Sequence, residues 1–560
     1  MKIYLAQQNY HIGNFEANTG KIISAINEAR HQGGDLIIFP ELAVCGYPPR
    51  DFLEFNDFVQ QCLECVGIIA REANDIAVLV GAPSFNPVPE GKDLFNSAYF
   101  LHEGKVQAVV NKTLLPNYDI FDEYRYFEPA NEWNIIHYKG KKLAVTICED
   151  IWDMSENPLY RVRPMDQLIA QQPDLMINLS ASPFDYLHAE GRKSTVKQNV
   201  MKYGLPMVYC NAVGSQTEIV FDGGSLVMSA QGDLVAELPY FSEALQSVTL
   251  LEDGSFDAAI IQPAENVPIR ESIPETLDAE RGIDVIHTAL LSGIRDYFGK
   301  MGFSKAIVAS SGGIDSAVVL ALACAALGAE NVKAVLLPSQ FSTGHSVSDA
   351  EHLSKNLGNP YTIIPIKGVF ESYEAALKQE FDGLPFNVAE ENLQSRIRGA
   401  MVMALSNKFG SILLNTSNKS ELSTGYGTLY GDMAGGLGIL GDLYKVQVYA
   451  LARYINRNGE IIPGNIITKA PSAELRPEQK DSDSLPEYDV LDPILYQYIE
   501  RRRGPKEIIA AGNDPALVSR ILKLVNTNEY KRNQFCPIIR VSPKAFGIGR
   551  RVPIVGKYLS

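Results

Sequence analysis

Short runs rich in apolar residues alternate along the chain with longer segments of helical periodicity. In the first half, the segments 18–31 and 192–203 have the helical spacing of apolar positions. Four short runs are typical of buried strands, namely 36–39, 77–80, 143–147 and 175–179. Strands that alternate with helices indicate layered α/β structure.

The second half has the same alternation. The runs 305–309, 332–337 and 411–415 have strand character, and each is preceded or followed by a helix-like segment. Strand and helix in strict alternation favour a parallel, doubly wound sheet. We therefore expect an α/β fold in this half as well.

A proline-rich stretch separates the two halves. Pro263, Pro268 and Pro274 fall within about a dozen residues and interrupt both periodicities, which is typical of a linker. The predicted organisation is a domain over 1–265, a linker over 266–280 and a second domain over 281–560. The acidic stretch 474–489 is interpreted either as a lid or as a plain solvated loop.

Composition limits the classes of function. The chain has 560 residues, which is too long for one ordinary core, and its hydrophobic share of 46% and charged share of 21% are typical of globular proteins. Because 66 acidic residues outnumber 50 basic ones, the formal net charge is −16. Such a field repels phosphate, so we expect no nucleic-acid partner and no anionic membrane surface. A local basic site for one small phosphorylated ligand remains compatible with this charge.

The seven cysteines are scattered, which suits a reducing cytoplasm better than a disulfide framework. Cys62 and Cys65 form a C-x-x-C pair without a second pair, and we favour buried helix positions over a redox or metal role. No apolar stretch approaches the roughly 20 residues of a membrane span, and no signal peptide is visible. The expected location is the cytoplasm.

Three reactive side chains follow three predicted strands of the first half. Glu41 follows 36–39, Lys112 follows 106–110, and Cys148 ends the run 143–147. A thiol is mostly protonated at neutral pH, so a carboxylate must take its proton and later return it to a leaving amine. A fixed ammonium can stabilise a tetrahedral oxyanion. This set of residues is suited to amide hydrolysis.

The motifs Pro40-Glu41, Lys112-Thr113-x-Leu-Pro116 and Cys148-Glu149-Asp150, in this order, resemble the nitrilase, or carbon-nitrogen hydrolase, superfamily over about 1–260. The resemblance implies an αββα sandwich, with Glu41 as general base, Lys112 as oxyanion stabiliser and Cys148 as nucleophile. It places Glu123 near the pocket as an auxiliary acidic residue. The glutamine contacts it implies are Tyr118, Glu149, Ser182 and His188.

His188 departs from that pattern, because Lys or Arg is more familiar at its position. Two interpretations are open: a hydrogen-bond donor to the substrate without permanent charge, or an exposed loop residue.

In the second half, a phosphate-binding loop follows the strand 305–309. Its sequence is Ser310-Ser311-Gly312-Gly313-Ile314-Asp315-Ser316, and a helix of small residues follows over 317–327. Adjacent glycines allow a tight turn that aims backbone N–H groups at an anion, and the helix N-terminus adds its dipole. The Lys of a Walker A motif is absent. The motif resembles the PP-loop of ATP pyrophosphatases, which cleave ATP between the α and β phosphates. Asp315 suits Mg²⁺ because a hard cation takes oxygen ligands.

Further motifs narrow the family. In chain order they include Glu390 to Arg398, Asn415 to Leu422, Gly425 to Asp432, Pro471 to Leu475 and Tyr530-Lys531-Arg532. Together they resemble the NAD synthetases from about 280 onward, and the joined halves resemble the glutamine-dependent NAD synthetases. Where the family often has His, this chain has Tyr530.

The resemblance implies ATP contacts at Ser310, Ser311, Gly312, Gly313, Ile314, Asp315, Ser316 and Thr416. It implies deamido-NAD⁺ contacts at Asn392, Glu421 and Lys531, and Mg²⁺ contacts at Asp315 and Glu421. Glu421 has two implied roles that the sequence does not separate.

The activity implied is synthesis of NAD⁺ from deamido-NAD⁺, ATP and glutamine, with release of AMP and pyrophosphate. A homo-oligomer is also implied, together with a channel that carries ammonia between the sites. Two alternatives remain at this point. One is a different PP-loop amidotransferase, such as one that makes GMP or asparagine. The other is a ligand sensor built on degenerate enzyme folds, although the catalytic positions are intact.

Overall fold

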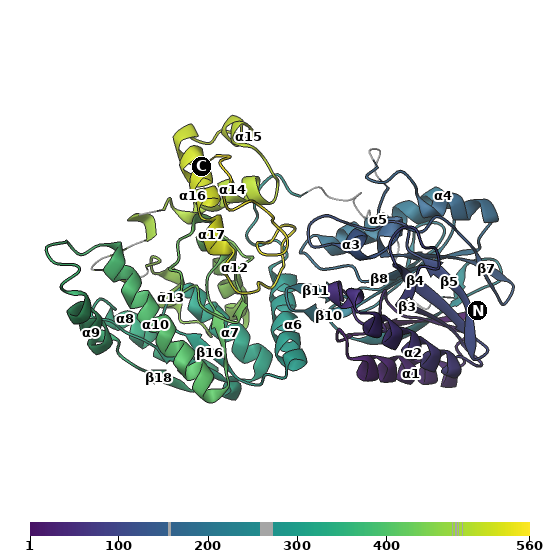
Figure 1. The fold of residues 1–560 in the computed structure, drawn as a ribbon, viewed down its shortest axis with the longest axis horizontal. Helices are drawn as coiled ribbons and strands as arrows, with labels where there is room; N and C mark the ends of the chain where they lie inside the picture. The colour runs from purple at the N-terminus through teal and green to yellow at the C-terminus, as the bar shows by residue number, and fades with distance from the viewer. Residues whose placement is uncertain are drawn as a thin grey trace. The chain divides into compact units, whose positions relative to one another are not determined.

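The computed structural model describes residues 1–154, 158–257, 273–472, 474–476, 479, 481–483 and 485–559 (Figure 1). The chain divides into two compact units, Met1–Ser272 and Ile273–Ser560. The first part of the predicted linker, 266–272, lies outside the described residues. So do Ala473 and, within the predicted lid or loop 474–489, positions 477, 478, 480 and 484.

The first unit contains two large β-sheets. One has the strand order β15-β14-β1-β2-β3-β4-β5, and the other has the order β13-β12-β9-β8-β7-β6. The strands of the first sheet are β1 (Lys2–Gln7), β2 (Leu36–Ile38), β3 (Ala77–Phe85), β4 (Leu94–His102), β5 (Lys105–Asn111), β14 (Ala244–Leu250) and β15 (Phe256–Asp257). Those of the second are β6 (Ile136–Tyr138), β7 (Lys141–Ile147), β8 (Leu175–Ser180), β9 (Met207–Asn211), β12 (Leu226–Met228) and β13 (Leu234–Glu237). A separate hairpin joins β10 (Val213–Gln216) and β11 (Ile219–Asp222).

The core of the first unit lies between the two sheets. Leu36 and Leu79 of one sheet and Val145 and Ile177 of the other belong to the same buried cluster. Helices α1 (Phe15–His31) and α2 (Asn56–Glu72) pack together on the outer side of the first sheet. A second apolar cluster joins α4 (Pro164–Leu168) and α5 (His188–Tyr203) to the outer face of the other sheet. The layers are therefore αββα, and this prediction is confirmed.

Most predicted elements of this unit agree with the structure. Each predicted strand lies within or overlaps an observed one, and the predicted helices 18–31 and 192–203 lie within α1 and α5. Cys62 and Cys65 are both buried positions of α2, as the core interpretation requires. A short helix, α3 (Glu123–Tyr126), lies in the middle of the loop between β5 and β6.

The second unit is built on a parallel sheet with the order β18-β17-β16-β19-β20. Its strands are β16 (Ala306–Ala309), β17 (Val332–Leu336), β18 (Tyr361–Ile363), β19 (Ile412–Asn415) and β20 (Leu437–Gly438). The chain adds strands on one side of β16 and then returns to add β19 on the other. The predicted doubly wound sheet is confirmed. Ligands of such sheets bind at the carboxyl ends of the two strands where the order reverses, here β16 and β19.

Helices cover both faces of this sheet (Figure 1). Helix α7 packs against α6 and α12, whereas α9 and α10 share an apolar cluster with β16 and β17. The C-terminal helices α14 and α16 form a further core of their own. The helices are α6 (Ile283–Met301), α7 (Ile314–Leu327), α8 (Gly344–Leu357), α9 (Lys367–Leu377), α10 (Val388–Phe409), α11 (Lys419–Thr424), α12 (Lys445–Ile455), α13 (Gly464–Thr468), α14 (Tyr488–Ile499), α15 (Pro505–Ala510), α16 (Pro515–Thr527) and α17 (Glu529–Arg532). None of the helices in the described ranges is both long enough and apolar enough for a bilayer span.

Candidate active sites

Three strand ends of the first unit carry Glu41, Lys112 and Cys148. Glu41 follows β2, Lys112 follows β5, and Cys148 begins a short 3₁₀ turn, Cys148–Ile151, directly after β7. All three are buried, with exposed fractions of 2%, 0% and 5%. Cys148 has a φ of +43°, in the left-handed region that side chains other than Gly seldom adopt. A nucleophile at a tight turn after a strand is held on rigid backbone.

The Lys112 ammonium lies between two carboxylates. Its Nζ is 2.7 Å from Glu41 Oε1 and 2.8 Å from each carboxylate oxygen of Glu123. Glu41 is held by two further donors, since Asn96 Nδ2 donates to Oε1 at 2.7 Å and the Ala181 N–H donates to Oε2 at 3.1 Å. The positions of the candidate base and the candidate oxyanion stabiliser are thus fixed by one hydrogen-bond network.

The electrostatics of this cluster suit a thiol nucleophile that needs a base. Burial raises the pKa of the Cys148 thiol well above its usual range, and the Glu41 charge raises it further while Lys112 opposes both. Burial also lowers the pKa of Lys112, but Glu123 and Glu41 outweigh burial and keep the ammonium charged. Burial raises the pKa of Glu123 to about 7 despite Lys112. Cys148 is therefore held as a neutral thiol, so an attack by its sulfur would require transfer of the proton to a carboxylate.

Asp150 fixes the spacing between the Lys112 and Cys148 segments. Its carboxylate accepts the backbone N–H groups of Thr113 at 3.0 Å and Leu114 at 2.8 Å from one segment. It also accepts the N–H of Ile147, the last residue of β7, at 2.9 Å. One buried side chain therefore joins the ends of two strands.

The residues proposed for glutamine form two contacting groups. The Tyr118 hydroxyl donates to Glu149 at 2.9 Å, and the Tyr160 hydroxyl donates to the same carboxylate at 3.2 Å. Burial raises the pKa of Glu149 to about 7, an effect that Lys112 and the two tyrosines partly oppose. Glu149 is adjacent in sequence to Cys148, and its carboxylate is close enough to influence the Cys148 thiol electrostatically.

The second group centres on His188. Its Nε2 is 2.6 Å from Ser182 Oγ, and its ring stacks on Trp152 at 4.9 Å between centroids. His188 is the first residue of α5, and its side chain is 21% exposed. It is therefore not an exposed loop residue, which was one of the two interpretations of the sequence.

Sequence reasoning missed several polar groups of this site. Asn96 and Tyr47 contact Glu41 and Glu123, respectively, and Asp150 and Tyr160 position the segment that carries Cys148 and Glu149. Asn96 does leave one sequence signal, because it and the adjacent Ser97 are polar residues within the largely apolar run of β4.

The second unit contains a cavity of about 550 Å³ at the carboxyl ends of β16 and β19. Its lining includes all but one of the residues predicted to bind ATP, deamido-NAD⁺ and metal. They are Ser310, Ser311, Gly313, Ile314, Asp315, Ser316, Asn392, Thr416, Glu421 and Lys531. The exception, Gly312, is not part of the lining but forms the turn of the loop.

The loop from Ser310 to Ser316 has the geometry of an anion cradle. Gly312 has a φ of +80°, and a Cβ added there would lie 2.2 Å from the Ser346 carbonyl oxygen, so only glycine fits. Ser311 Oγ accepts the Gly313 N–H at 3.2 Å, and Ser316 Oγ donates to the Gly313 carbonyl at 3.0 Å. Helix α7 then begins at Ile314, with its N-terminal N–H groups directed at the cavity.

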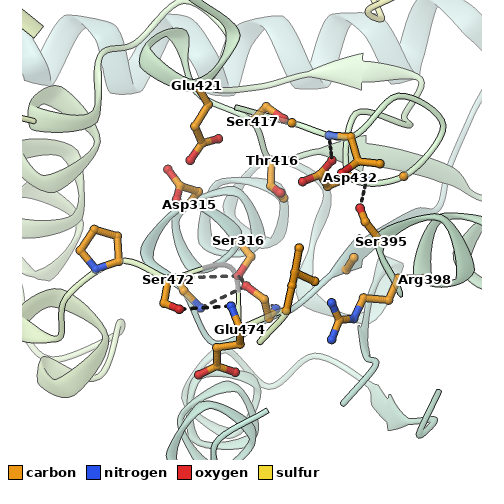
Figure 2. A pocket seen from close by; sticks show the side chains of 18 of the residues that line it. Asp315, Ser316, Ser395, Arg398, Thr416, Ser417, Glu421, Asp432, Ser472 and Glu474 are labelled. Carbon is orange, nitrogen blue, oxygen red and sulfur yellow. Dashed lines mark hydrogen bonds between the residues drawn. The ribbon is translucent and has the colours of Figure 1, made fainter. Parts of the chain in front are cut away.

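Two carboxylates that line this cavity, those of Asp315 and Glu421, point toward each other (Figure 2). Lys445, which the sequence reasoning missed, lies between them, with its Nζ 2.5 Å from Asp315 Oδ2 and 3.5 Å from Glu421 Oε1. Asn418 Nδ2 donates to the other Asp315 oxygen at 2.8 Å. Burial raises the pKa of Glu421 to about 8, and Asp315 raises it further while Lys445 opposes. The pair therefore retains repulsion that a further cation would relieve.

Asn392 and Lys531 support one loop of the cavity wall. Asn392 Oδ1 accepts the Thr428 hydroxyl at 2.6 Å, and Lys531 Nζ donates to the carbonyls of Gly425 and Gly427 at 2.7 and 2.8 Å. Burial lowers the pKa of Lys531. Both side chains lie where a second substrate could contact them in the same cavity as the phosphate loop.

Comparison with protein families gives a match in each unit. The carbon-nitrogen hydrolase family matches residues 2–253, and the NAD synthase family matches residues 286–535.

Relatives match over the whole chain. The glutamine-dependent NAD(+) synthetase of Synechocystis is 44% identical, over 99% of this chain and 98% of its own. The glutamine-dependent NAD(+) synthetase of Thermotoga maritima is 40% identical, over 100% of this chain and 99% of its own. A glutamine-dependent NAD⁺ synthetase from Acinetobacter baumannii was solved in complex with adenosine diphosphate. It is 38% identical over 99% of this chain and 98% of its own, with a TM-score of 0.76. A glutamine-dependent NAD(+) synthetase from Cytophaga hutchinsonii, at 21% identity, shares the fold over 100% of this chain and 98% of its own, with a TM-score of 0.81.

Proposed function

The chain belongs to the glutamine-dependent NAD(+) synthetases, and we propose that its two units supply the two halves of this reaction. The first unit hydrolyses glutamine to glutamate and ammonia. The second uses ATP to adenylate deamido-NAD⁺ and then amidates it to NAD⁺, with release of AMP and pyrophosphate. The observation that carries the proposal is the presence in one chain of a buried Cys-Glu-Lys cluster and a cavity built around a phosphate-binding loop.

In the first unit, Cys148 Sγ attacks the side-chain amide carbon of glutamine while Glu41 takes the thiol proton. Lys112 stabilises the tetrahedral oxyanion. Glu41 returns the proton to the departing ammonia and then activates a water that hydrolyses the glutamyl thioester. The raised pKa of the Cys148 thiol supports this order, because the proton must be removed during the attack.

Glutamine has an ammonium and a carboxylate that must also be recognised. We assign Tyr118 and Glu149 to the α-ammonium, since an ionised Glu149 held by two hydroxyl groups is an anionic acceptor. Ser182 and His188 are assigned to the rest of glutamine, with His188 as an uncharged hydrogen-bond donor.

In the second unit, the carboxylate of deamido-NAD⁺ attacks the α-phosphorus of ATP and pyrophosphate leaves. Ammonia then attacks the acyl adenylate and displaces AMP. The loop from Ser310 to Ser316, together with Thr416, binds ATP, while Asn392, Glu421 and Lys531 bind deamido-NAD⁺. Both groups line one cavity, as an in-line transfer between two substrates requires.

Asp315 and Glu421 are the proposed ligands of Mg²⁺. They are hard oxygen donors that face one another, and the repulsion between them favours a divalent cation. The described residues contain no cluster of three or more metal-ligating side chains, so the remaining ligands would be phosphate oxygens and water. When bound, Mg²⁺ would neutralise charge on the phosphates.

We further propose a cytoplasmic homo-oligomer. Six of the cysteines are buried thiols, which supports a reducing compartment. The oligomer rests on the resemblance of the first unit to nitrilases, which commonly pair.

Family membership favours this function over the two alternatives from the sequence, a PP-loop amidotransferase that makes GMP or asparagine and a degenerate sensor. Glutamine labelled with ¹⁵N at the side-chain amide, supplied with ATP and deamido-NAD⁺, tests it by mass spectrometry. We expect NAD⁺ that carries the label in its carboxamide, with one AMP for each NAD⁺. Failure to form NAD⁺, or NAD⁺ without the label, would contradict the proposal.

A further inference from the structure

Arg398 is a partly buried cation in the wall of the nucleotide cavity. It lies on α10, and its Nε donates to the carbonyl oxygen of Leu337, just beyond β17, at 3.0 Å. Among the described residues, no carboxylate lies within ion-pair distance of its guanidinium. The two carboxylates that influence it are those of Glu474 and Asp432.

Both of these carboxylates are engaged by other donors. Glu474 accepts the hydroxyl groups of Ser346 at 2.6 Å and Thr343 at 2.9 Å, and Asp432 accepts the backbone N–H of Thr428 at 2.7 Å. Burial lowers the pKa of Arg398, which reflects the cost of holding its charge away from water. The protein therefore keeps an arginine desolvated without giving it a counter-ion of its own.

The guanidinium projects into the cavity. In Figure 2 it points into the space bounded on the other side by Asp315 and Glu421. Because Nε is held by the Leu337 carbonyl, the planar end of the side chain is oriented, and its terminal N–H groups remain for a ligand of the cavity that Arg398 lines. An oriented guanidinium matches the geometry of a phosphate, which can accept two parallel hydrogen bonds.

The hydrogen bonds of β17 place Arg398 beside the start of the phosphate loop. The Ser310 N–H donates to the Val335 carbonyl at 3.0 Å, and Arg398 Nε donates to the carbonyl two residues further on. Two residues of a strand span about 7 Å. The buried Ser310 Oγ has no hydrogen-bond partner within the described part of the chain. A hydroxyl without a hydrogen-bond partner and a guanidinium without an ion-pair partner, both judged within the described residues, thus lie at the same edge of the cavity.

We propose that Arg398 binds a phosphate group of ATP and completes, from α10, the cradle that the Ser310 to Ser316 loop forms. The inference rests on the proposed function, because it takes ATP as the ligand of this cavity. Arg398 is then a substrate-binding residue whose counter-ion arrives with ATP.

The test compares Arg398→Gln and Arg398→Lys with wild type, and uses Arg295→Gln as a matched control. Like Arg398, Arg295 donates a hydrogen bond from Nε to a backbone carbonyl, here that of Ala326. Arg295 is exposed on α6 and does not line the cavity. ATP with Mg²⁺ is titrated calorimetrically into each full-length protein without deamido-NAD⁺. We expect Arg398→Gln to weaken ATP binding about 10- to 100-fold. Arg398→Lys should weaken it less, because lysine keeps the positive charge but lacks the planar guanidinium that donates two parallel hydrogen bonds.

Steady-state assays driven by ammonium then identify the substrate. The KM for ATP should rise in Arg398→Gln, while the KM for deamido-NAD⁺ stays within about threefold. Unchanged ATP affinity, or a rise in the KM for deamido-NAD⁺ alone, would overturn the inference. If wild type and Arg295→Gln bind ATP but make no NAD⁺, the proposed function fails while the inference on ATP still stands.

Thermal unfolding separates binding from a structural role. Removing a partly buried cation without a counter-ion should leave the melting temperature of ligand-free Arg398→Gln equal to that of wild type or higher. The upward shift caused by added ATP should be smaller in the variant. A lower melting temperature without ligand, together with an unchanged ATP shift, would instead indicate that Arg398 only supports the fold.

Discussion

At Cys148, neighbouring charges act on the thiol in opposite directions. Burial and Glu41 favour the neutral thiol, while Lys112 favours the thiolate. Lys112 is itself held between Glu41 and Glu123. If both carboxylates are ionised, these three side chains together have a net charge of −1. The pKa of Glu123 near 7 shows how strongly the protein disfavours that state. A catalytic proton can therefore move within the cluster at low cost.

The pH dependence of glutamine hydrolysis should report the ionisation of Glu149. Its pKa is raised to about 7. In the proposed mode of binding, only the ionised carboxylate attracts the α-ammonium of glutamine. We expect kcat/KM for ammonia release to rise with pH through about 7 and to level off above it. Glu149→Gln should lower kcat/KM about 10- to 100-fold and remove this inflection.

Tyr160→Phe is the matched control for that profile. The Tyr160 hydroxyl donates to Glu149 and lowers its pKa, so loss of the hydroxyl should move the inflection to higher pH without removing it. An inflection that persists unchanged in Glu149→Gln would assign it to another group.

One site residue in each unit, Asn96 in the first and Lys445 in the second, could not be recognised from the sequence, and the physical reason is the same for both. The role of Asn96 depends on Glu41, 55 positions away, and the role of Lys445 depends on Asp315, 130 positions away. A polar residue that acts through such a partner looks like any other polar residue in its own segment. Glu41, Cys148 and Asp315 could be predicted because each lies in a short local motif beside a strand.

At the scale of elements, continuous apolar runs made the central strands predictable. Strands β7 and β8 are buried almost throughout and lie in the middle of a sheet, so their sequences are apolar with few interruptions. Strand β14 was not predicted. It is half-exposed along its length and pairs with β1 across about 240 residues of chain, so neither its pattern nor its neighbours in sequence indicate its partner.

The turn between β16 and α7 carries a sharp prediction. Gly312→Ala would place a Cβ 2.2 Å from the Ser346 carbonyl at a φ of +80°, so the loop must move. We expect ammonium-driven NAD⁺ synthesis and ATP binding to fall at least about 100-fold, since the N–H groups would no longer converge on one phosphate. Glutamine hydrolysis by the first unit should remain when measured without ATP.

Gly299→Ala provides the matched control. Gly299 lies within α6, its added Cβ meets no atom within 4 Å, and alanine favours helix. Full NAD⁺ synthesis is expected from this variant. Normal ATP binding by Gly312→Ala would contradict the account of the loop.

For the whole molecule, the two units have separate cores and separate constellations of residues. The Cys148 cluster is formed entirely within Met1–Ser272, and the nucleotide cavity entirely within Ile273–Ser560. Each half-reaction can therefore be disabled without disturbing the residues of the other. We therefore expect glutamine hydrolysis and NAD⁺ synthesis to be separable by mutation.

Cys148→Ala tests that claim most directly, with Cys65→Ala, which removes a buried thiol of α2 in the same unit, as the control. NAD⁺ formation is measured for both variants with glutamine and, separately, with ammonium. We predict that Cys148→Ala lowers glutamine-driven synthesis at least about 1000-fold and keeps ammonium-driven synthesis within about twofold of wild type. Cys65→Ala should keep both. Loss of both activities in Cys148→Ala, or retention of glutamine-driven synthesis, would contradict the two-centre account.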